Sequence, residues 1–205
     1  TLLAIKNLPT DQNDLRNYMG CFLKSENNIL WHGNNNYVIK YDPKKKNAQF
    51  VNKINYCLDI IQQNDETVWI SDDRNALAKL NTTTNELTYF KYGESDFPDQ
   101  TNIILDLKIK DDNIFMATNT AGLVKLNTNT MEFSTIGDEY TSHVTSLDIF
   151  KDRIWVSTWK NGLLCFDAKT GNLLDRFNIK SGLPSNSLYM VKIDDNGNLW
   201  ATSSF

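Results

Sequence analysis

Short stretches in which apolar and polar residues alternate recur along the whole chain. Such alternation over four to eight residues predicts β-strands, whereas no window of comparable length shows the period of a helix. Five of these stretches resemble "NLWATS" and carry an aromatic residue at the same place. The aromatic residues follow one another at steps of 38, 46, 40 and 45 residues: Trp31, Trp69, Phe115, Trp155 and Trp200.

The surroundings of each aromatic residue repeat as well. One apolar strand precedes it, and two more strands follow it with turn residues between them, as in "RIWVSTWKNGLLCFDAKTGNLLDRF" from Arg153 to Phe177. A small residue stands seven positions after three of the aromatics: Ala76, Gly122 and Gly162. At such a position we expect a close backbone approach or an unusual turn dihedral.

Each unit of the repeat therefore contains four short strands. Four strands in roughly 40 to 45 residues are typical of a blade of a β-propeller. A single four-stranded sheet cannot cover either of its faces, and stacking blades around an axis buries both. The sequence predicts an all-β propeller whose repeated aromatic residues fill the space between blades.

The ends of the chain fall within blades in this frame. "LLAIKNLPTDQNDL" aligns with the fourth strand and exit loop of a unit, so we expect four complete four-stranded blades with a partial blade at each end, a segment of a seven-bladed propeller. One alternative is a five-bladed ring closed by Leu2–Ile5. Incomplete rings expose faces and strand edges, so the chain is expected either to self-associate or to belong to an unbroken propeller. The boundaries we expect are 1–14, 15–54, 55–92, 93–138, 139–180 and 181–205.

Composition narrows the function classes. The net charge is −4, which argues against a nucleic-acid surface, and no apolar run approaches membrane-spanning length. The three cysteines, Cys21, Cys57 and Cys165, show no CxxC spacing, so we expect buried cysteines that act as apolar side chains and no metal site. The start of the chain has neither a basic end nor an apolar stretch typical of a signal peptide.

The stretch "SGLPSNSLYMVKIDDNGNLWATSS", Ser181 to Ser204, resembles the two-component regulator propeller repeat. The matching features are its Gly-Leu-Pro turn, its Ser/Asn-rich entry and its Asp-x-x-Gly-x-Leu-Trp segment. The resemblance implies the periplasmic sensor region of hybrid two-component histidine kinases of Bacteroidetes, which are inner-membrane proteins. The kinase motifs themselves are not among these residues.

The resemblance also implies partners and a role. Many such propellers sense an oligosaccharide and control polysaccharide utilisation. The expected partners are an oligosaccharide ligand, the remaining blades and domains of the parent sensor, and a second parent chain in a homodimer. No cofactor and no nucleic acid are expected, and contact with the membrane is expected only through a part of the parent that this sequence does not contain.

The loops that follow the second and fourth strands of each blade should share one face. They are rich in Asn, Asp, Ser and Thr, which suits hydroxyl recognition. Trp159 is distinctive because its counterparts in other blades are polar, and a ring beside Lys160 could stack on a sugar. The competing interpretation is that Trp159 packs on a neighbouring loop. The candidate ligand-binding residues are Asp73, Arg74, Asn119, His143, Trp159, Lys160 and Asn161.

Two other function classes remain open. A protein-interaction propeller would bind no small ligand. An enzyme of the streptogramin-lyase type would need a catalytic histidine with a metal-holding glutamate, and the sequence offers only His32 and His143, with Glu139 the nearest acid to the latter. Because no hydrolase, metalloprotease or P-loop motif is found, we do not expect this chain to be an enzyme.

Overall fold

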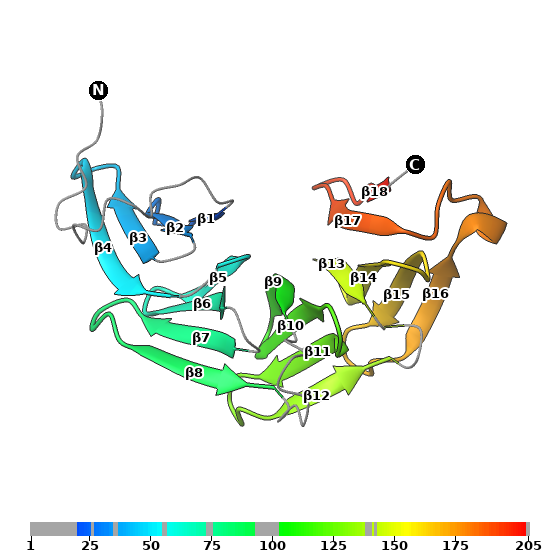
Figure 1. The fold of residues 1–205 in the computed structure, drawn as a ribbon, viewed down its shortest axis with the longest axis horizontal. Coiled ribbons are helices and arrows are strands. Elements are labelled where there is room, and N and C mark those ends of the chain that lie inside the picture. Colours follow the sequence, from blue (N-terminus) through cyan, green and yellow to red (C-terminus); the bar gives the residue numbers. More distant parts are fainter. Residues whose placement is uncertain are drawn as a thin grey trace. The chain divides into compact units, whose positions relative to one another are not determined.

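The computed structural model describes residues 20–25, 27–34, 37–54, 57–72, 76–92, 103–137, 141 and 143–203. The all-β prediction is confirmed, because these residues form four antiparallel four-stranded sheets and one two-stranded sheet (Figure 1). The expected strand of residues 1–14 lies outside the described residues. The chain divides into two compact units, residues 1–97 and 98–205, and each is described by itself.

The first unit contains two sheets in which consecutive strands are neighbours. Buried residues of both sheets form one core, to which Trp31 contributes from the first sheet and Ile60 and Val68 from the second. The strands of the first sheet are β1 (Cys21–Lys24), β2 (Leu30–Gly33), β3 (Tyr37–Asp42) and β4 (Asn47–Lys53). Those of the second are β5 (Ile60–Asn64), β6 (Thr67–Asp72), β7 (Ala76–Asn81) and β8 (Leu87–Lys91).

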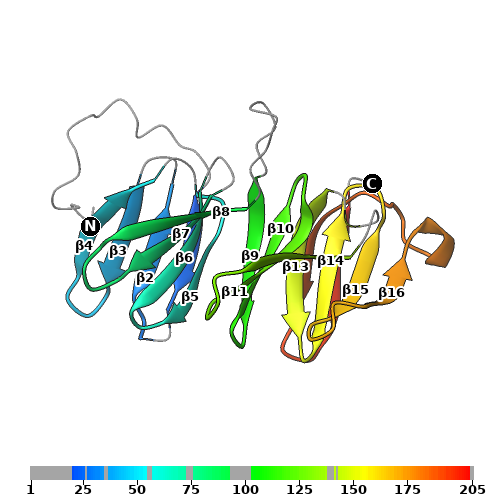
Figure 2. The ribbon, with the colours of Figure 1, turned by 90° about the horizontal axis from the view of Figure 1, so that it is seen from below.

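The second unit repeats this pattern with two full sheets and a hairpin, and β17 of the hairpin lies beside β13 and β14 (Figure 2). The first of its sheets contains β9 (Ile104–Lys110), β10 (Asn113–Thr118), β11 (Gly122–Asn127) and β12 (Phe133–Ile136). The next contains β13 (Val144–Phe150), β14 (Arg153–Thr158), β15 (Leu163–Asp167) and β16 (Leu173–Phe177). The hairpin consists of β17 (Leu188–Ile193) and β18 (Leu199–Ser203). Among the described residues, no helix has the length and apolar character needed to cross a membrane.

The repeated aromatic residues lie on the second strand of each sheet. Phe115 is buried in a core that includes Leu147 and Val156 of the following sheet. Trp155 packs against Leu188 and Val191 of the hairpin. Each of these rings therefore fills the space between its own sheet and the next one. In the hairpin, by contrast, Trp200 is 65% exposed.

Two of the glycines that follow the aromatic residues are required by the backbone. Gly122 and Gly162 both have positive φ, at 79° and 76°. A Cβ atom at Gly122 would lie 2.7 Å from the carbonyl oxygen of Thr141, and one at Gly162 would collide with the carbonyl of Phe177. Glycine is thus needed where the second strand turns into the third, both for its dihedral and for space.

A disulfide joins the two sheets of the first unit. Cys21 on β1 is bonded to Cys57, which precedes β5, with the two Cα atoms 6.1 Å apart. Gly33, the β-sheet partner of Cys21, makes room for the bridge, because a Cβ atom there would lie 2.8 Å from the sulfur of Cys21. The expectation that the cysteines act only as apolar side chains is therefore wrong for this pair, which is buried as expected but bonded. It describes only Cys165, which is buried and free.

A buried carboxylate joins the two full sheets of the second unit. Asp106 on β9 accepts hydrogen bonds from the hydroxyl of Ser146, at 2.6 Å, and from the backbone N–H of Leu147, at 3.1 Å. Its other oxygen lies 2.6 Å from the ammonium of Lys108. Burial by itself raises the pKa of Asp106, but the charge and hydrogen bond of Lys108 and the Ser146 hydroxyl together hold this pKa below its usual value.

Candidate functional site

Trp159 lies in the tight loop between β14 and β15. Its backbone N–H donates to the carbonyl of His143 at 3.0 Å, which ties this loop to the segment that enters β13. The loop closes on itself because both the backbone N–H and the hydroxyl of Thr158 donate to the carbonyl of Gly162, at 3.0 and 2.8 Å. The backbone that carries the Trp159 ring is therefore held in place before any ligand arrives.

The ring of Trp159 meets the ring of Tyr189 edge to face. Their centroids are 5.7 Å apart and their planes make an angle of 86°. Trp159 is 51% exposed and Tyr189, at the start of β17, is 48% exposed. The pair is thus an aromatic surface at the loop end of the second unit, shared between a loop of one sheet and the hairpin that follows it. We name it the Trp159–Tyr189 surface.

Polar groups lie beside this surface. Lys160 is exposed next to Trp159, and His143 is exposed with a φ of 60°. The side-chain oxygen of Asn161 accepts a hydrogen bond from the guanidinium of Arg176 at 3.2 Å. The arrangement therefore combines an exposed aromatic edge with cationic and amide groups, which suits stacking together with hydrogen bonding to hydroxyl or carboxylate groups.

Asn119 occupies the position of Trp159 in the preceding sheet and has a different role. Its backbone N–H donates to the carbonyl of Ile103 at 3.1 Å, as that of Trp159 does to His143. Its side-chain oxygen, however, accepts the backbone N–H of Ile103 at 2.7 Å. The structure thus places Asn119 in a loop closure, whereas Trp159, Lys160, Asn161 and His143 lie together around β13 and the β14–β15 loop.

The candidates of the first unit are only partly described. Asp73 and Arg74 lie outside the described residues. Their neighbour Asp72 is buried at the end of β6. Burial, and after it the charge of Asp72 and a hydrogen bond to it, raise the pKa of Tyr89 on β8. Asp72 therefore interacts with Tyr89, a residue of its own sheet.

The two histidines have different surroundings. His32 stacks on Phe22 with ring centroids 4.3 Å apart, and its Nδ1 lies 3.2 Å from the carbonyl oxygen of Cys21. His143 lies beside Trp159, as described above, and Glu139 lies outside the described residues. In the described part of the chain, no three or more His, Cys, Asp or Glu side chains gather in a way that could hold a metal ion.

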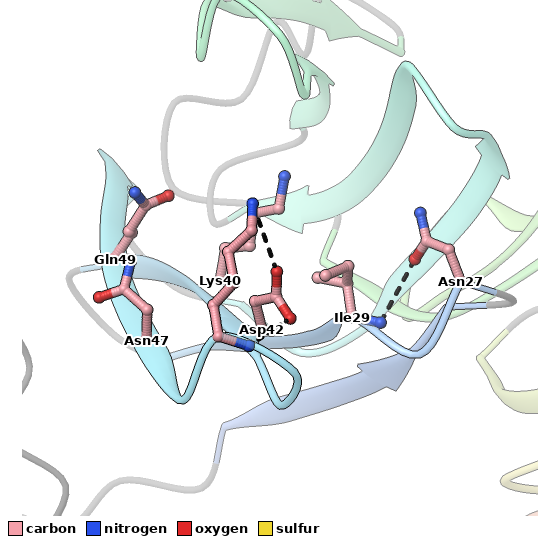
Figure 3. Close-up of a pocket in the computed structure, with 7 residues that line it drawn as sticks. Asn27, Ile29, Lys40, Asp42, Asn47 and Gln49 are labelled. Carbon is pink, nitrogen blue, oxygen red and sulfur yellow. Dashed lines mark hydrogen bonds and ion pairs between the residues drawn. The ribbon is translucent and has the colours of Figure 1, made fainter.

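A hollow of about 250 Å³ lies in the first sheet, at the end that carries the β1–β2 and β3–β4 turns (Figure 3). The turn residue Asn27 accepts the backbone N–H of Ile29 at 3.3 Å, and the ion pair between Lys45 and Asp42 spans 3.7 Å. With two lysines and one aspartate, the lining carries one net positive charge. The residues that line it are Asn27, Ile29, Lys40, Asp42, Lys45, Asn47 and Gln49.

Sequence reasoning did not single out this hollow, although the repeat holds a signal for it. Lys40 is the β3 partner of Trp31, and its ammonium lies 5.2 Å from the centre of the Trp31 ring. Lys79 stands at the same position in the next sheet, 5.5 Å from the Trp69 ring, and lines a second hollow there. A lysine is thus the cross-strand partner of the blade aromatic in three sheets, since Lys125 pairs in the same way with Phe115. In both sheets of the first unit the ammonium lies over the tryptophan ring, in line with cation–π attraction.

Comparison with solved structures gives the same fold. The extracellular domain of the hybrid two-component system BT4673 from B. thetaiotaomicron matches with a TM-score of 0.71 at 15% identity, over 90% of this chain and 26% of that one. The corresponding domain of BT3049 from the same organism matches with a TM-score of 0.67 at 17% identity, over 89% of this chain and 25% of that one. PorZ, a surface component of the type-IX secretion system of Porphyromonas gingivalis, matches with a TM-score of 0.69 at 15% identity, over 90% and 30% of the two chains.

These likenesses show a partial β-propeller and agree with the resemblance drawn from the repeat motif. The chain spans about a quarter of the length of the two-component extracellular domains it matches. No protein-family model matches the sequence, and no curated protein does.

Proposed function

We propose that this chain is an extracytoplasmic ligand-sensing segment of a hybrid two-component sensor and that its ligand is an oligosaccharide. The fold it shares with the extracellular domains of BT4673 and BT3049 supports the sensor role. The chain itself performs no catalysis in this proposal. The parent sensor supplies the remaining blades, the membrane anchor and the kinase core, and it acts as a homodimer.

The disulfide between Cys21 and Cys57 supports the location. Disulfides persist in oxidising compartments such as the periplasm and are rare in the bacterial cytosol. This bridge is buried in the core between two sheets, with both cysteines less than a tenth exposed. A structural bridge at such a place fits folding outside the cytoplasm.

The Trp159–Tyr189 surface carries the ligand proposal. Large aromatic side chains are normally buried, yet both rings are about half exposed, Trp159 in the loop after β14 and Tyr189 at the start of β17. Sugar rings have apolar faces that stack on aromatic rings and hydroxyl groups that need hydrogen-bond partners. Lys160, Asn161 and Arg176 supply such partners next to the rings, and the two cationic groups among them favour an acidic sugar.

Calorimetry with a panel of neutral and uronate-containing oligosaccharides tests this proposal. We expect binding without turnover, and a loss of roughly thirtyfold in affinity for Trp159→Ala, which corresponds to about 2 kcal/mol for an aromatic side chain at the centre of a binding surface. Trp200→Ala is the matched control, because Trp200 is also exposed but lies away from this surface, and it should bind as the wild type does. Turnover of any sugar, or equal binding by Trp159→Ala, would contradict the proposal.

One observation favours the protein-interaction class as a second candidate. Phe22 on β1 is 76% exposed and Trp200 on β18 is 65% exposed, and neither belongs to the Trp159–Tyr189 surface. Exposed large apolar side chains on sheet faces are typical of surfaces that another protein covers. Absence of sugar binding together with a stable complex between chains would support this class.

A further inference from the structure

The hollow of the first sheet lies on the face that the second sheet covers. Lys40 pairs with Trp31 on β2 and with Gln49 on β4, so these three side chains stand on the same face. Trp31 packs there into the core shared with the second sheet. At the end of the strands, the side-chain amide of Asn27 donates to the carboxylate of Asp65, in the β5–β6 turn, at 3.4 Å. The hollow is therefore what the second sheet leaves open at the end of a face that it otherwise covers.

The repeat builds this hollow a second time with the opposite charge. Lys79 holds the position of Lys40 in the second sheet and lines a hollow of about 500 Å³ there. Glu66 and Glu86 line it too, so with one lysine and two glutamates this lining carries one net negative charge. The first sheet has Asn47 at the position of Glu86, and its lining carries one net positive charge. Of these two hollows, the one in the first sheet suits an anion.

The β3–β4 turn adds to the positive charge of the first hollow. Lys44, Lys45 and Lys46 follow one another there, and all three are exposed. Asp42 accepts the backbone N–H groups of Lys44 and Lys45, at 2.9 and 3.2 Å, so its carboxylate is used in closing the turn. The ammonium of Lys45 lies 3.7 Å from that carboxylate in an exposed ion pair, which is weak. An anion that enters the hollow can therefore draw Lys45 to itself with little loss of free energy.

The uncharged lining groups suit hydroxyl groups. The side chains of Asn47 and Gln49 stand beside Lys40 (Figure 3) and make no hydrogen bond within the described part of the chain. Each amide offers both donors and an acceptor. A bare oxyanion can use only the donors, whereas a sugar acid also has hydroxyl groups for the acceptors. At about 250 Å³ the hollow is smaller than the roughly 300 to 1,000 Å³ of a pocket for a drug-sized ligand, so it fits one sugar unit.

We propose that this hollow binds a single hexuronate unit, with its carboxylate between the ammonium groups of Lys40 and Lys45 and its hydroxyl groups on Asn47 and Gln49. The site goes beyond the proposed function, because it lies in the first unit and uses no residue of the Trp159–Tyr189 surface. A free monosaccharide and the end unit of an acidic chain present the same carboxylate and hydroxyl groups to it.

An NMR titration with D-galacturonate tests the site through its own tryptophan. The ammonium of Lys40 lies 5.2 Å from the centre of the Trp31 ring, whose indole N–H makes no hydrogen bond within the described residues. Movement of this ammonium toward a carboxylate should shift the Trp31 indole signal and the amide signals of β4, with a dissociation constant of about 1 mM, an ordinary value for a ligand of this size. The indole N–H of Trp69 donates to Gln63 at 2.8 Å, and its signal should not move.

Three variants assign the binding to the lysines. Lys40→Met keeps an apolar stem beside the Trp31 ring and removes the charge, so galacturonate should bind about tenfold more weakly, the usual loss for one charge-assisted hydrogen bond. Lys45→Ala, in the exposed turn, tests the site without touching the core and should weaken binding by about threefold. Lys79→Met is the matched control in the second sheet and should bind as the wild type does. The amide signals of β4 report binding in all three, and the spectrum shows that each is folded.

Other ligands separate recognition of a sugar acid from attraction of charge alone. At constant ionic strength, D-galactose and sulfate should each bind at least about tenfold more weakly than galacturonate, because galactose lacks the charge and sulfate lacks the hydroxyl groups. Digalacturonate that binds more tightly than galacturonate would assign the site to the end of a chain, and equal binding would assign it to the monosaccharide.

Three outcomes would overturn the proposal: sulfate that binds as well as galacturonate, a Trp31 signal that does not shift, or unchanged binding by both Lys40→Met and Lys45→Ala. A shift confined to the Trp159 signal would place the sugar on the Trp159–Tyr189 surface, which supports the proposed function and rejects this second site. Conversely, Trp159→Ala should leave the binding of galacturonate in the hollow unchanged, so the two proposals can fail separately.

Discussion

The two units join neighbouring sheets from the same position of the repeat by different chemistry. Cys21 pairs across β1 and β2 with Gly33, two residues after the blade aromatic Trp31. Asp106 pairs in the same way with Ala117, two residues after Phe115. One position on the first strand thus carries a disulfide to the next sheet in the first unit and a hydrogen-bonded carboxylate in the second.

This difference shows that the repeat fixes where sheets are joined and leaves open by which bond. The disulfide fits beside the glycine at Gly33, and it restricts the unfolded chain whatever the pH. The carboxylate of Asp106 depends on its charge and on Lys108. The first unit should therefore respond to reductant and the second to acid, and the predictions below try to break each link separately.

Removal of the disulfide should have the largest effect. The bridge closes a loop of 36 residues, so the double substitution Cys21→Ser with Cys57→Ser should lower the free energy of unfolding of the first unit by about 4 kcal/mol. Hydrogen exchange read by mass spectrometry should show faster exchange in β1–β8 and unchanged exchange in β9–β18. Reduction of the wild type should have the same effect.

Cys165→Ser is the control for this experiment, because Cys165 is not bridged and lies in the second unit. Addition of a reductant should leave the stability of the double variant unchanged, since it has no bridge to lose. If the double variant unfolds as the wild type does, the disulfide does not stabilise the first unit, and the proposed difference between the two units is wrong for the first one.

Asp106→Asn should have a smaller effect, confined to the second unit. The amide keeps the shape but loses the charge that Lys108 pairs with, and its NH₂ group cannot replace an acceptor oxygen, whether it faces Leu147 or the ammonium of Lys108. We expect a loss of about 2 to 3 kcal/mol in the free energy of unfolding. Asp175→Asn, at an exposed site on β16, should change this free energy by less than about 0.5 kcal/mol.

The pH dependence of Asp106 has a defined sign. Because its pKa is lower in the folded than in the unfolded chain, its contribution to stability is present above about pH 4 and is lost as the pH falls through the folded-state pKa. Urea unfolding of the second unit between about pH 2 and 5 should therefore show a steeper loss in the wild type than in Asp106→Asn. If the stability of the two proteins falls equally steeply with pH, the charge of Asp106 does not stabilise the contact between the two sheets.

Much of the fold could be predicted because the repeat makes the same prediction several times. Alternation marked the strands, and the aromatic frame grouped them into four-stranded sheets. The disulfide was missed because each cysteine was considered alone. Cys21 precedes Trp31 by 10 residues and Cys57 precedes Trp69 by 12, so alignment on the aromatics would have placed both near the first strands of adjacent sheets.

The candidate site could be predicted only as a set of loops. The repeat put Trp159 and Asn119 at equivalent positions, and their equal backbone hydrogen bonds show that this equivalence is real. Sequence cannot tell that one side chain closes its own loop while the other stays exposed, since this depends on neighbours. Tyr189, which meets Trp159, was missed because it belongs to the next sheet and its exposure follows from tertiary packing.

Alkylation of the three cysteines should give the smallest effect and sharpen the comparison between the units. Burial raises the pKa of Cys165 to about 11, and the opposing contribution of Arg153 does not offset it. At pH 8 its thiol is therefore protonated as well as shielded, and it should not react with iodoacetamide in the folded chain.

After reduction without denaturant, Cys21 and Cys57 should become labelled while Cys165 stays protected, because reduction breaks only the disulfide of the first unit. Asp106→Asn should reverse the order and expose Cys165 first, as peptide mass spectrometry can show. If Cys165 of the wild type is labelled at the rate of a free thiol, the second unit opens although the hydrogen bonds of Asp106 are intact, which would contradict this prediction.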